Sequence, residues 1–230
     1  MRTLRLLALA LLVMGFLVPT VSPSYAQVVV PEDCAVPPDI NLDDYNVIIG
    51  TNQSETLVGT DGPDFICGLL GNDTIYALGG DDLILSDTTT FFGNLQAPGG
   101  NDTVFAGRGA DQILSGPGND VVEGGPGDDF LALAQGNDVG TGGPGSDGII
   151  GGFGQDAVIG GPGDDQLVGG PGNDLINGGA GDDLLVGDLA PDSDPPPVPV
   201  PPSTADRCIG ASGLDTAFDC DRTIGVEAFI

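Results

Sequence analysis

The chain has 230 residues, of which 40 are glycine and 19 proline, and 34 acidic residues against five arginines give a net charge of −29. This glycine content, more than double the usual share of about 7%, excludes an ordinary globular domain, and the lack of strict glycine triplets excludes collagen. The absence of histidine and lysine excludes Ser-His-Asp and Cys-His nucleophile systems, HExxH zinc sites, P-loops and Schiff-base lysines, and the scarcity of arginine excludes nucleic-acid binding.

The amino-terminal segment, residues 1–26, predicts a secretory signal peptide. Two arginines precede a continuous apolar run over residues 6–18, and Ser24 and Ala26 place small residues at the −3 and −1 positions of a cleavage site. A transmembrane anchor is the alternative, but 13 apolar residues fall short of the ~20 that a membrane span needs. We therefore expect a secreted, extracellular protein with no membrane span in its mature chain.

Four cysteines, Cys34, Cys67, Cys208 and Cys220, become interpretable once export is expected. An even number of cysteines outside the cytosol favours disulfides, of which four cysteines allow three arrangements. Proximity in the sequence favours Cys34–Cys67 and Cys208–Cys220. A zinc site is the alternative, but the chain has no C-x-x-C pair.

An internal repeat organises the centre of the chain. Residues 97–186 divide without a gap into ten units of nine residues, in which position 4 is always glycine and position 6 always aspartate. Position 8 is Val, Ile or Leu in every unit except at Gly140. The ten units read APGGNDTVF, AGRGADQIL, SGPGNDVVE, GGPGDDFLA, LAQGNDVGT, GGPGSDGII, GGFGQDAVI, GGPGDDQLV, GGPGNDLIN and GGAGDDLLV.

Looser units surround this array. Residues 50–85 form four of them, with Glu55 in place of the first aspartate, and the interval 86–96 separates the two arrays. One further degenerate unit covers residues 210–218, and residues 46–49 match the strand half of an incomplete unit. A repeat in such constant phase argues against disorder of the folded chain, although the composition would permit it.

A period of nine residues fits neither a helix nor an ordinary strand, and predicts a turn followed by a short strand. Glycine at positions 1, 2 and 4 permits tight reversal with positive φ, and proline at position 3 fixes φ there. Positions 7 to 9 then form a strand whose position 8 faces inward. Two units make one coil with two opposed strands. Fourteen units predict seven stacked coils, about 34 Å long, around a thin column of position-8 side chains.

The aspartate at position 6 indicates a bound cation. Units two apart lie on the same side of the stack, so their carboxylates would repel each other without a counter-ion. Ca²⁺ binds six to eight oxygens from carboxylates and backbone carbonyls, and glycine-rich turns leave their carbonyls accessible. A metal-free solenoid with a solvated acidic face is the alternative, but it leaves the repulsion and the glycines unexplained.

The pattern G-G-x-G-x-D-x-U-x over residues 50–218 resembles the RTX (repeats-in-toxin), or haemolysin-type, calcium-binding nonapeptide family. The resemblance implies an all-β fold, a parallel β-roll of about 14–15 repeats, with Ca²⁺ held between turns n and n+2 by position-6 aspartates and turn carbonyls. Up to about 12 Ca²⁺ would fit, and we expect the chain to fold only on binding them. The metal ligands carried over are Asp64, Asp73, Asp82, Asp102, Asp111, Asp120, Asp129, Asp138, Asp147, Asp156, Asp165, Asp174 and Asp183.

The remaining segments interrupt or close the repeats. We expect residues 27–49 to be an amino-terminal cap, residues 187–207 a proline-rich loop, and residues 208–230 the degenerate last repeat with a carboxy-terminal cap and a closing strand from residue 223. The interval 86–96 contains Phe91 and Phe92, which predict either packing over the roll or an exposed contact site.

The sequence therefore predicts an exported, non-catalytic calcium-binding protein with a structural or surface-interaction role. Its expected partners are calcium ions and, beyond them, an unidentified protein or cell surface. Two alternatives stay open. One is an adhesion or interaction module that uses the 86–96 loop, and the other, less favoured, is a carboxylate-dependent hydrolase, for which no aspartate or glutamate pair outside position 6 stands out.

Overall fold

The computed structural model describes residues 40–87, 99–187, 207–210, 216–218, 222–224 and 228–229, together with Pro31, Cys34, Val36 and Cys220. The expected signal peptide, Phe91 and Phe92, and most of the proline-rich segment lie outside these residues. One 3-10 helix, η1 (Leu42–Asp44), precedes the strands. Within the described part of the chain, no helix is long and apolar enough to cross a membrane.

Two parallel sheets form the fold, and successive strands alternate between them. The first sheet contains β1 (Asn46–Ile49), β3 (Asp64–Cys67), β5 (Leu83–Leu85), β7 (Gln112–Leu114), β9 (Phe130–Gln135), β11 (Gly148–Phe153), β13 (Gln166–Val168), β15 (Leu184–Val186), β17 (Thr216–Phe218) and β19 (Ala228–Phe229). The second contains β2 (Thr56–Val58), β4 (Thr74–Gly79), β6 (Thr103–Arg108), β8 (Val121–Glu123), β10 (Val139–Thr141), β12 (Ala157–Pro162), β14 (Leu175–Ala180), β16 (Arg207–Ile209) and β18 (Arg222–Ile224). The predicted all-β parallel solenoid is confirmed.

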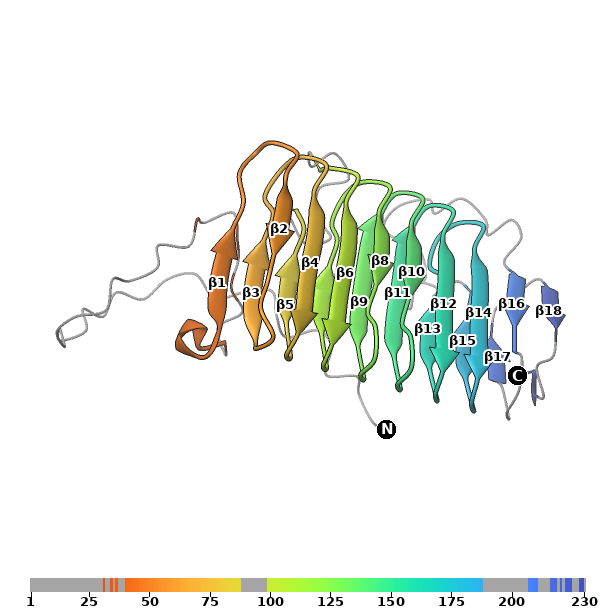
Figure 1. The fold of residues 1–230 in the computed structure, drawn as a ribbon. Coiled ribbons are helices and arrows are strands. Elements are labelled where there is room, and N and C mark those ends of the chain that lie inside the picture. Colours follow the sequence, from red (N-terminus) through yellow and green to blue (C-terminus); the bar gives the residue numbers. More distant parts are fainter. Residues whose placement is uncertain are drawn as a thin grey trace, which may run out of the picture.

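Strand pairing follows the nine-residue period. Within the long array, paired residues lie two units apart in sequence, as in Gly148↔Gln166 of β11 and β13. Across the interruption β4 pairs with β6, where Thr74 lies opposite Thr103, so the added residues do not break the stack. Figure 1 shows the strands of both arrays side by side in one continuous roll. Several strands have six residues instead of the expected three, because the pairing continues into turn positions 1 to 3.

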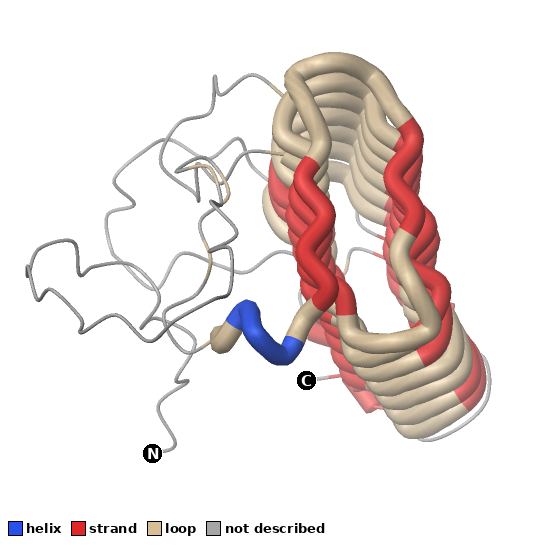
Figure 2. Tube along the Cα trace, turned by 60° about the vertical axis from the view of Figure 1, so that its left-hand side comes forward, coloured by secondary structure: helices blue, strands red, loops and turns tan. Residues whose placement is uncertain are grey.

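Figure 2 shows the strands of the two sheets facing each other along the roll, and buried aliphatic side chains form a narrow core between them. Position 8 faces inward, as predicted, since parallel strands alternate their side chains between the two faces. These side chains expose 8% of their surface or less: Leu57, Ile66, Ile75, Ile84, Val104, Ile113, Val122, Leu131, Ile149, Val158, Leu167, Ile176 and Leu185.

The exception at Gly140 is compensated within its own unit. A Cβ at Gly140 would lie 2.9 Å from Cδ1 of Leu133, which stands at position 1 where most units have glycine. Leu133 is fully buried in the same core cluster. One unit therefore fills the core from its turn instead of from its strand.

A second hydrophobic cluster lies on the outer face of the first sheet. Its buried members are Cys34, Phe65, Cys67, Leu83 and Leu85. Partly buried residues from the amino-terminal segment, among them Val36, Ile40, Leu42 and Tyr45, pack against it. The amino-terminal segment thus covers the outside of β3 and β5, and β1 adds one strand to the end of the sheet.

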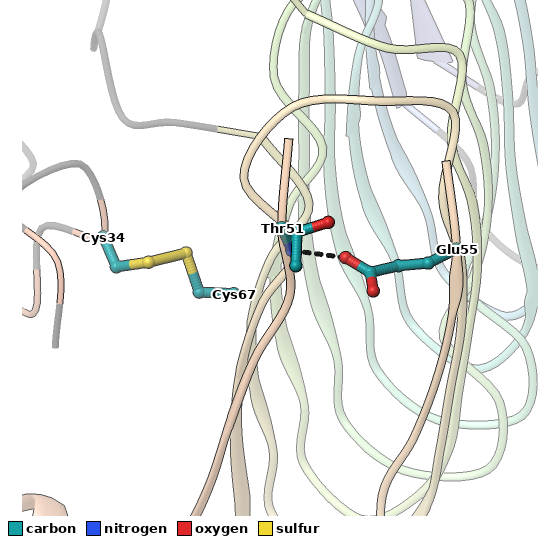
Figure 3. The surroundings of a disulfide bond; sticks show 4 residues. All are labelled: Cys34, Thr51, Glu55 and Cys67. Carbon is teal, nitrogen blue, oxygen red and sulfur yellow. Dashed lines mark hydrogen bonds between the residues drawn. A yellow bond between two sulfur atoms is a disulfide. The ribbon is translucent and has the colours of Figure 1, made fainter. Parts of the chain in front are cut away.

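Both cysteine pairs favoured by proximity form disulfides, Cys34–Cys67 and Cys208–Cys220. The first ties the amino-terminal segment to β3 (Figure 3). Cys208 lies on β16, opposite Ile176, and occupies the inward position that Val, Ile or Leu fill elsewhere. The sequence did not predict β16, because its residues lack the turn pattern that precedes the other strands. The expected closing strand is present as two short strands, β18 and β19.

Candidate metal centre

The position-6 aspartates form two columns, one along each edge of the roll. Each aspartate ends a turn and directly precedes or begins a strand, so the strand register stacks equivalent carboxylates above one another. All 13 expose 3% of their surface or less. The first column is Asp64, Asp82, Asp111, Asp129, Asp147, Asp165 and Asp183, and the second is Asp73, Asp102, Asp120, Asp138, Asp156 and Asp174.

One oxygen of each stacked carboxylate accepts a hydrogen bond from the preceding coil. The backbone N–H of one aspartate donates to Oδ1 of the aspartate one coil further along, as from Asp129 to Asp147 and from Asp147 to Asp165, both at 2.8 Å. The same bond crosses the interruption between Asp73 and Asp102. These bonds orient each carboxylate by its neighbour's backbone.

The second oxygen is the unusual one. Oδ2 is buried and accepts no hydrogen bond in ten of these aspartates: Asp73, Asp82, Asp102, Asp111, Asp120, Asp129, Asp138, Asp147, Asp156 and Asp165. A buried charged oxygen without a partner is costly, at about 1–3 kcal/mol or more per group. Two columns of such oxygens therefore require protons or cations.

Where position 1 is glycine, several of these oxygens, those of Asp73, Asp129, Asp156 and Asp165, lie close to a backbone carbonyl of the neighbouring turn. A Cβ at Gly160 would lie 2.1 Å from Asp165 Oδ2 and 2.5 Å from the carbonyl oxygen of Gly178. Gly124 shows the same arrangement with Asp129 and Gly142, at 2.5 and 2.9 Å. Glycine at position 1 thus leaves a space in which a carboxylate oxygen and a carbonyl oxygen of successive turns face each other.

Burial raises the pKa of these carboxyl groups well above the ordinary value. Desolvation is the largest cause, backbone N–H donation opposes it, and for several of them repulsion from neighbouring aspartates adds to it. The pKa is raised to about 6 for Asp111, Asp120 and Asp156, to about 7 for Asp82, Asp102, Asp129 and Asp165, and to about 8 for Asp138. It is also raised for Asp73 and Asp147.

The donor set fits a hard divalent cation. Among the described residues, no three Asp, Glu, Cys or His side chains cluster closely enough to hold a metal by themselves. A cation in these columns would therefore take carboxylate and carbonyl oxygens together, which is the ligand preference of Ca²⁺. Thiolate and imidazole ligands are excluded, since both cysteine pairs are oxidised and the chain has no histidine.

The amino-terminal end of the columns differs from the rest. Asp64 Oδ2 accepts from the backbone N–H of Thr60 at 2.6 Å, and its Oδ1 accepts from the side-chain amide of Asn46 at 2.7 Å. Glu55 accepts from the backbone N–H of Thr51, as Figure 3 shows. In the first turns, hydrogen-bond donors of the protein therefore compensate part of the carboxylate charge.

The structure also reveals features that the sequence reasoning missed. The N–H at position 5 donates to the position-5 side chain of the preceding coil, as from Asn137 to Asn119 at 2.8 Å. The recurrence of Asn and Asp at this position could have indicated the ladder. Asp87, by contrast, has no counterpart in other units, and no sequence signal marked it; it exposes only 3% of its surface.

These observations define a class of protein, a parallel β-solenoid whose glycine-rich turns stack buried aspartates beside backbone carbonyls. A model of the RTX calcium-binding nonapeptide repeat matches residues 49–84, 99–131, 134–167 and 159–193, which together are more than half of the chain. The chain belongs to this family. No curated protein matches the chain as a whole or in part.

Proposed function

We propose that this protein is exported and folds on binding Ca²⁺ along its two aspartate columns, and that its role is structural or one of surface interaction, without catalysis. The observation that carries the proposal is the set of buried Oδ2 atoms that accept no hydrogen bond. Family membership supports calcium as the ion. The 13 position-6 aspartates would supply the carboxylate ligands and the glycine-rich turns the carbonyls, for up to about 12 ions.

Folding is expected to depend on calcium because the columns repel themselves without it. Binding of several cations to the folded chain alone shifts the equilibrium towards that state. Circular dichroism of residues 27–230 during a Ca²⁺ titration tests this. The β signal should appear with Ca²⁺, disappear on chelation, and not appear with Mg²⁺ at equal concentration. A spectrum indifferent to calcium and chelator would overturn the proposal.

A matched pair of variants separates the columns from acidic charge in general. Asp147→Asn removes a charge from a buried column, whereas Asp128→Asn removes one from an exposed position-5 residue whose oxygen accepts from the N–H of Ser146. Asparagine keeps that acceptor. The calcium midpoint of folding should rise severalfold for Asp147→Asn and change much less for Asp128→Asn, whose charge acts on Asp129 and Asp147 only through space. Equal midpoints would show that position 6 has no special part in binding.

Export is supported by the expected signal peptide and by two disulfides, which persist in oxidising compartments. Expression of the full chain in a bacterial host tests this part of the proposal. The protein outside the cytoplasm should begin after Ala26, as amino-terminal sequencing would report. Retention of the full-length chain in the cytoplasm would contradict it.

A further inference from the structure

The turn at the junction of the two arrays is built differently from all the regular ones. The N–H of Ser86 donates to the carbonyl of Leu114, as the position-1 N–H of other turns donates one coil along. Ser86 and Asp87 therefore occupy turn positions 1 and 2. A Cβ at Gly99 would lie 1.8 Å from the carbonyl oxygen of Pro117, which places Gly99 at position 3. The interruption thus lies inside a turn and begins two residues later than the interval 86–96 suggested.

Asp87 brings a carboxylate to a turn position that is usually glycine. In the neighbouring turn on the same side, Gly116 occupies position 2. Asp87 is 3% exposed, and its two carboxylate oxygens accept from the N–H of Gly100 at 3.0 and 3.2 Å. In the next turn the equivalent N–H, that of Gly118, donates instead to the carbonyl of Gln135. The carboxylate of Asp87 therefore lies between two stacked turns.

The junction turn contains several buried oxygens besides those of this carboxylate. The position of a Cβ on Gly99 would be 2.4 Å from Asp87 Oδ2 and 1.8 Å from the Pro117 carbonyl oxygen, so these two oxygens face the same small space. Oδ2 of Asp102 and Oγ of Ser86, in the same turn, are buried and accept no hydrogen bond. Such buried oxygens, left without donors, are ligands that suit a hard cation.

The electrostatics agree with this geometry. Burial, followed by repulsion from Asp102, raises the pKa of Asp87 to about 9. Asp120 and Asp73 contribute further repulsion. A second carboxylate in an already anionic column increases the attraction for a cation.

We propose that the junction turn holds a Ca²⁺ ion of its own, bound more tightly than those of the regular turns, with Asp87 adding a second carboxylate to that of Asp102 and Pro117 supplying a carbonyl oxygen. This inference rests on the proposed function, since it assigns a distinct affinity to one site in the same columns. The charge of the ligand set is what tunes calcium affinity in proteins. A tight ion here would link the two arrays at their junction turn.

Competition between residues 27–230 and a fluorescent calcium chelator of micromolar affinity tests the inference. The wild-type chain should bind one ion at least about tenfold more tightly than the others. Asp87→Asn, which keeps an acceptor for the N–H of Gly100, should lose this ion and keep the weaker class. Asp128→Asn, which removes an exposed charge, should keep both classes.

The outcomes separate the two proposals. A single affinity class in the wild-type chain, or a tight ion that persists in Asp87→Asn, would overturn the junction site and leave calcium-dependent folding intact. No calcium binding by the wild-type chain would overturn both. If circular dichroism shows that Asp87→Asn does not fold at saturating calcium, the number of tightly bound ions in the wild-type chain still tests the junction site.

Discussion

Asp147 and Ile149 are two residues apart in one unit, and both are almost completely buried. Asp147 belongs to a carboxylate column, however, and Ile149 to the aliphatic core. Ile149 packs between the sheets among other aliphatic side chains, and an apolar side chain needs nothing beyond that packing. Asp147 stacks in the same register, but one of its oxygens has no hydrogen-bond donor. The same nine-residue repeat therefore builds a core that is complete within the chain and a carboxylate column that is not.

The difference shows why this fold can respond to its surroundings. Each coil adds apolar burial, which favours the stack, and two more buried carboxylates, which oppose it. The balance depends on protons or cations rather than on further contacts within the protein. Substitutions or conditions that perturb the aliphatic core should therefore affect stability differently from those that perturb the carboxylate columns.

The largest expected effect is that of pH on the calcium-free chain, since many carboxyls contribute at once. Burial raises the pKa of nine described aspartates to between about 6 and about 9, so the folded chain binds protons more tightly than the unfolded chain does. This stabilisation by bound protons is fully present below the ordinary aspartate pKa of 3.8 and is lost as the pH rises through the raised pKa values of about 6 to 9.

Circular dichroism in the presence of chelator, from pH 4 to pH 8, measures this effect as the fraction of folded chain, with urea added at each pH where the chain is folded. Stability should fall steadily over the range, and saturating calcium should remove most of the fall, because a bound cation replaces the proton. A calcium-free chain that gains stability as the pH rises would show that the columns are not destabilised by their own charge.

The next largest effect should come from the turn stacking that both columns share. A Cβ at Gly145 would lie 1.6 Å from the carbonyl oxygen of Gly127, and φ there is +151°. Gly145→Val should therefore cost about 4 kcal/mol through overpacking and backbone strain. Gly148→Ala in the same unit, where a Cβ meets only the Phe130 ring at 3.3 Å, should change stability by less than about 0.5 kcal/mol. Similar urea midpoints for the two variants, with calcium bound, would contradict close stacking of the turns.

Truncation of Leu133 tests the core column without touching a carboxylate. Leu133→Ala should cost about 3 kcal/mol, because it leaves a cavity beside Gly140. The double variant with Gly140→Val should recover part of that loss, since the valine side chain would fill the space from position 8. Both effects should be measurable as urea midpoints at saturating calcium. Strictly additive losses would mean that the two positions do not share one space.

The smallest effect is expected from the exposed ladder at position 5. Asn119→Ala removes the acceptor for the N–H of Asn137 and should cost about 1 kcal/mol. Asn119→Asp keeps an acceptor and should cost less. The comparison is made by thermal unfolding with calcium bound. A larger loss for the aspartate variant would show that added charge outweighs the retained hydrogen bond.

Much of the fold could be predicted from the sequence because the chain repeats one local unit, a tight turn followed by a short strand. Gly145 and Asp147, at positions 4 and 6, predicted their own turn and strand, and the period alone fixed which side chains face inward. The choice of disulfide partners followed from proximity. Asp87 and β16 could not be predicted, since neither lies within a regular unit and both depend on which coil happens to lie beside them.

The sequence by itself determined the period, the inward column and the two rows of aspartates, because each is set within nine residues by turn geometry and strand alternation. Only the tertiary structure decided that the two arrays stack across their interruption, that Leu133 fills the space beside Gly140, and that Asp87 lies between two turns. Stacking across the interruption joins residues 29 apart in the chain, and Asp87 contacts Gly100, 13 residues away. Leu133 meets Gly140 only because one coil brings its turn against its own strand.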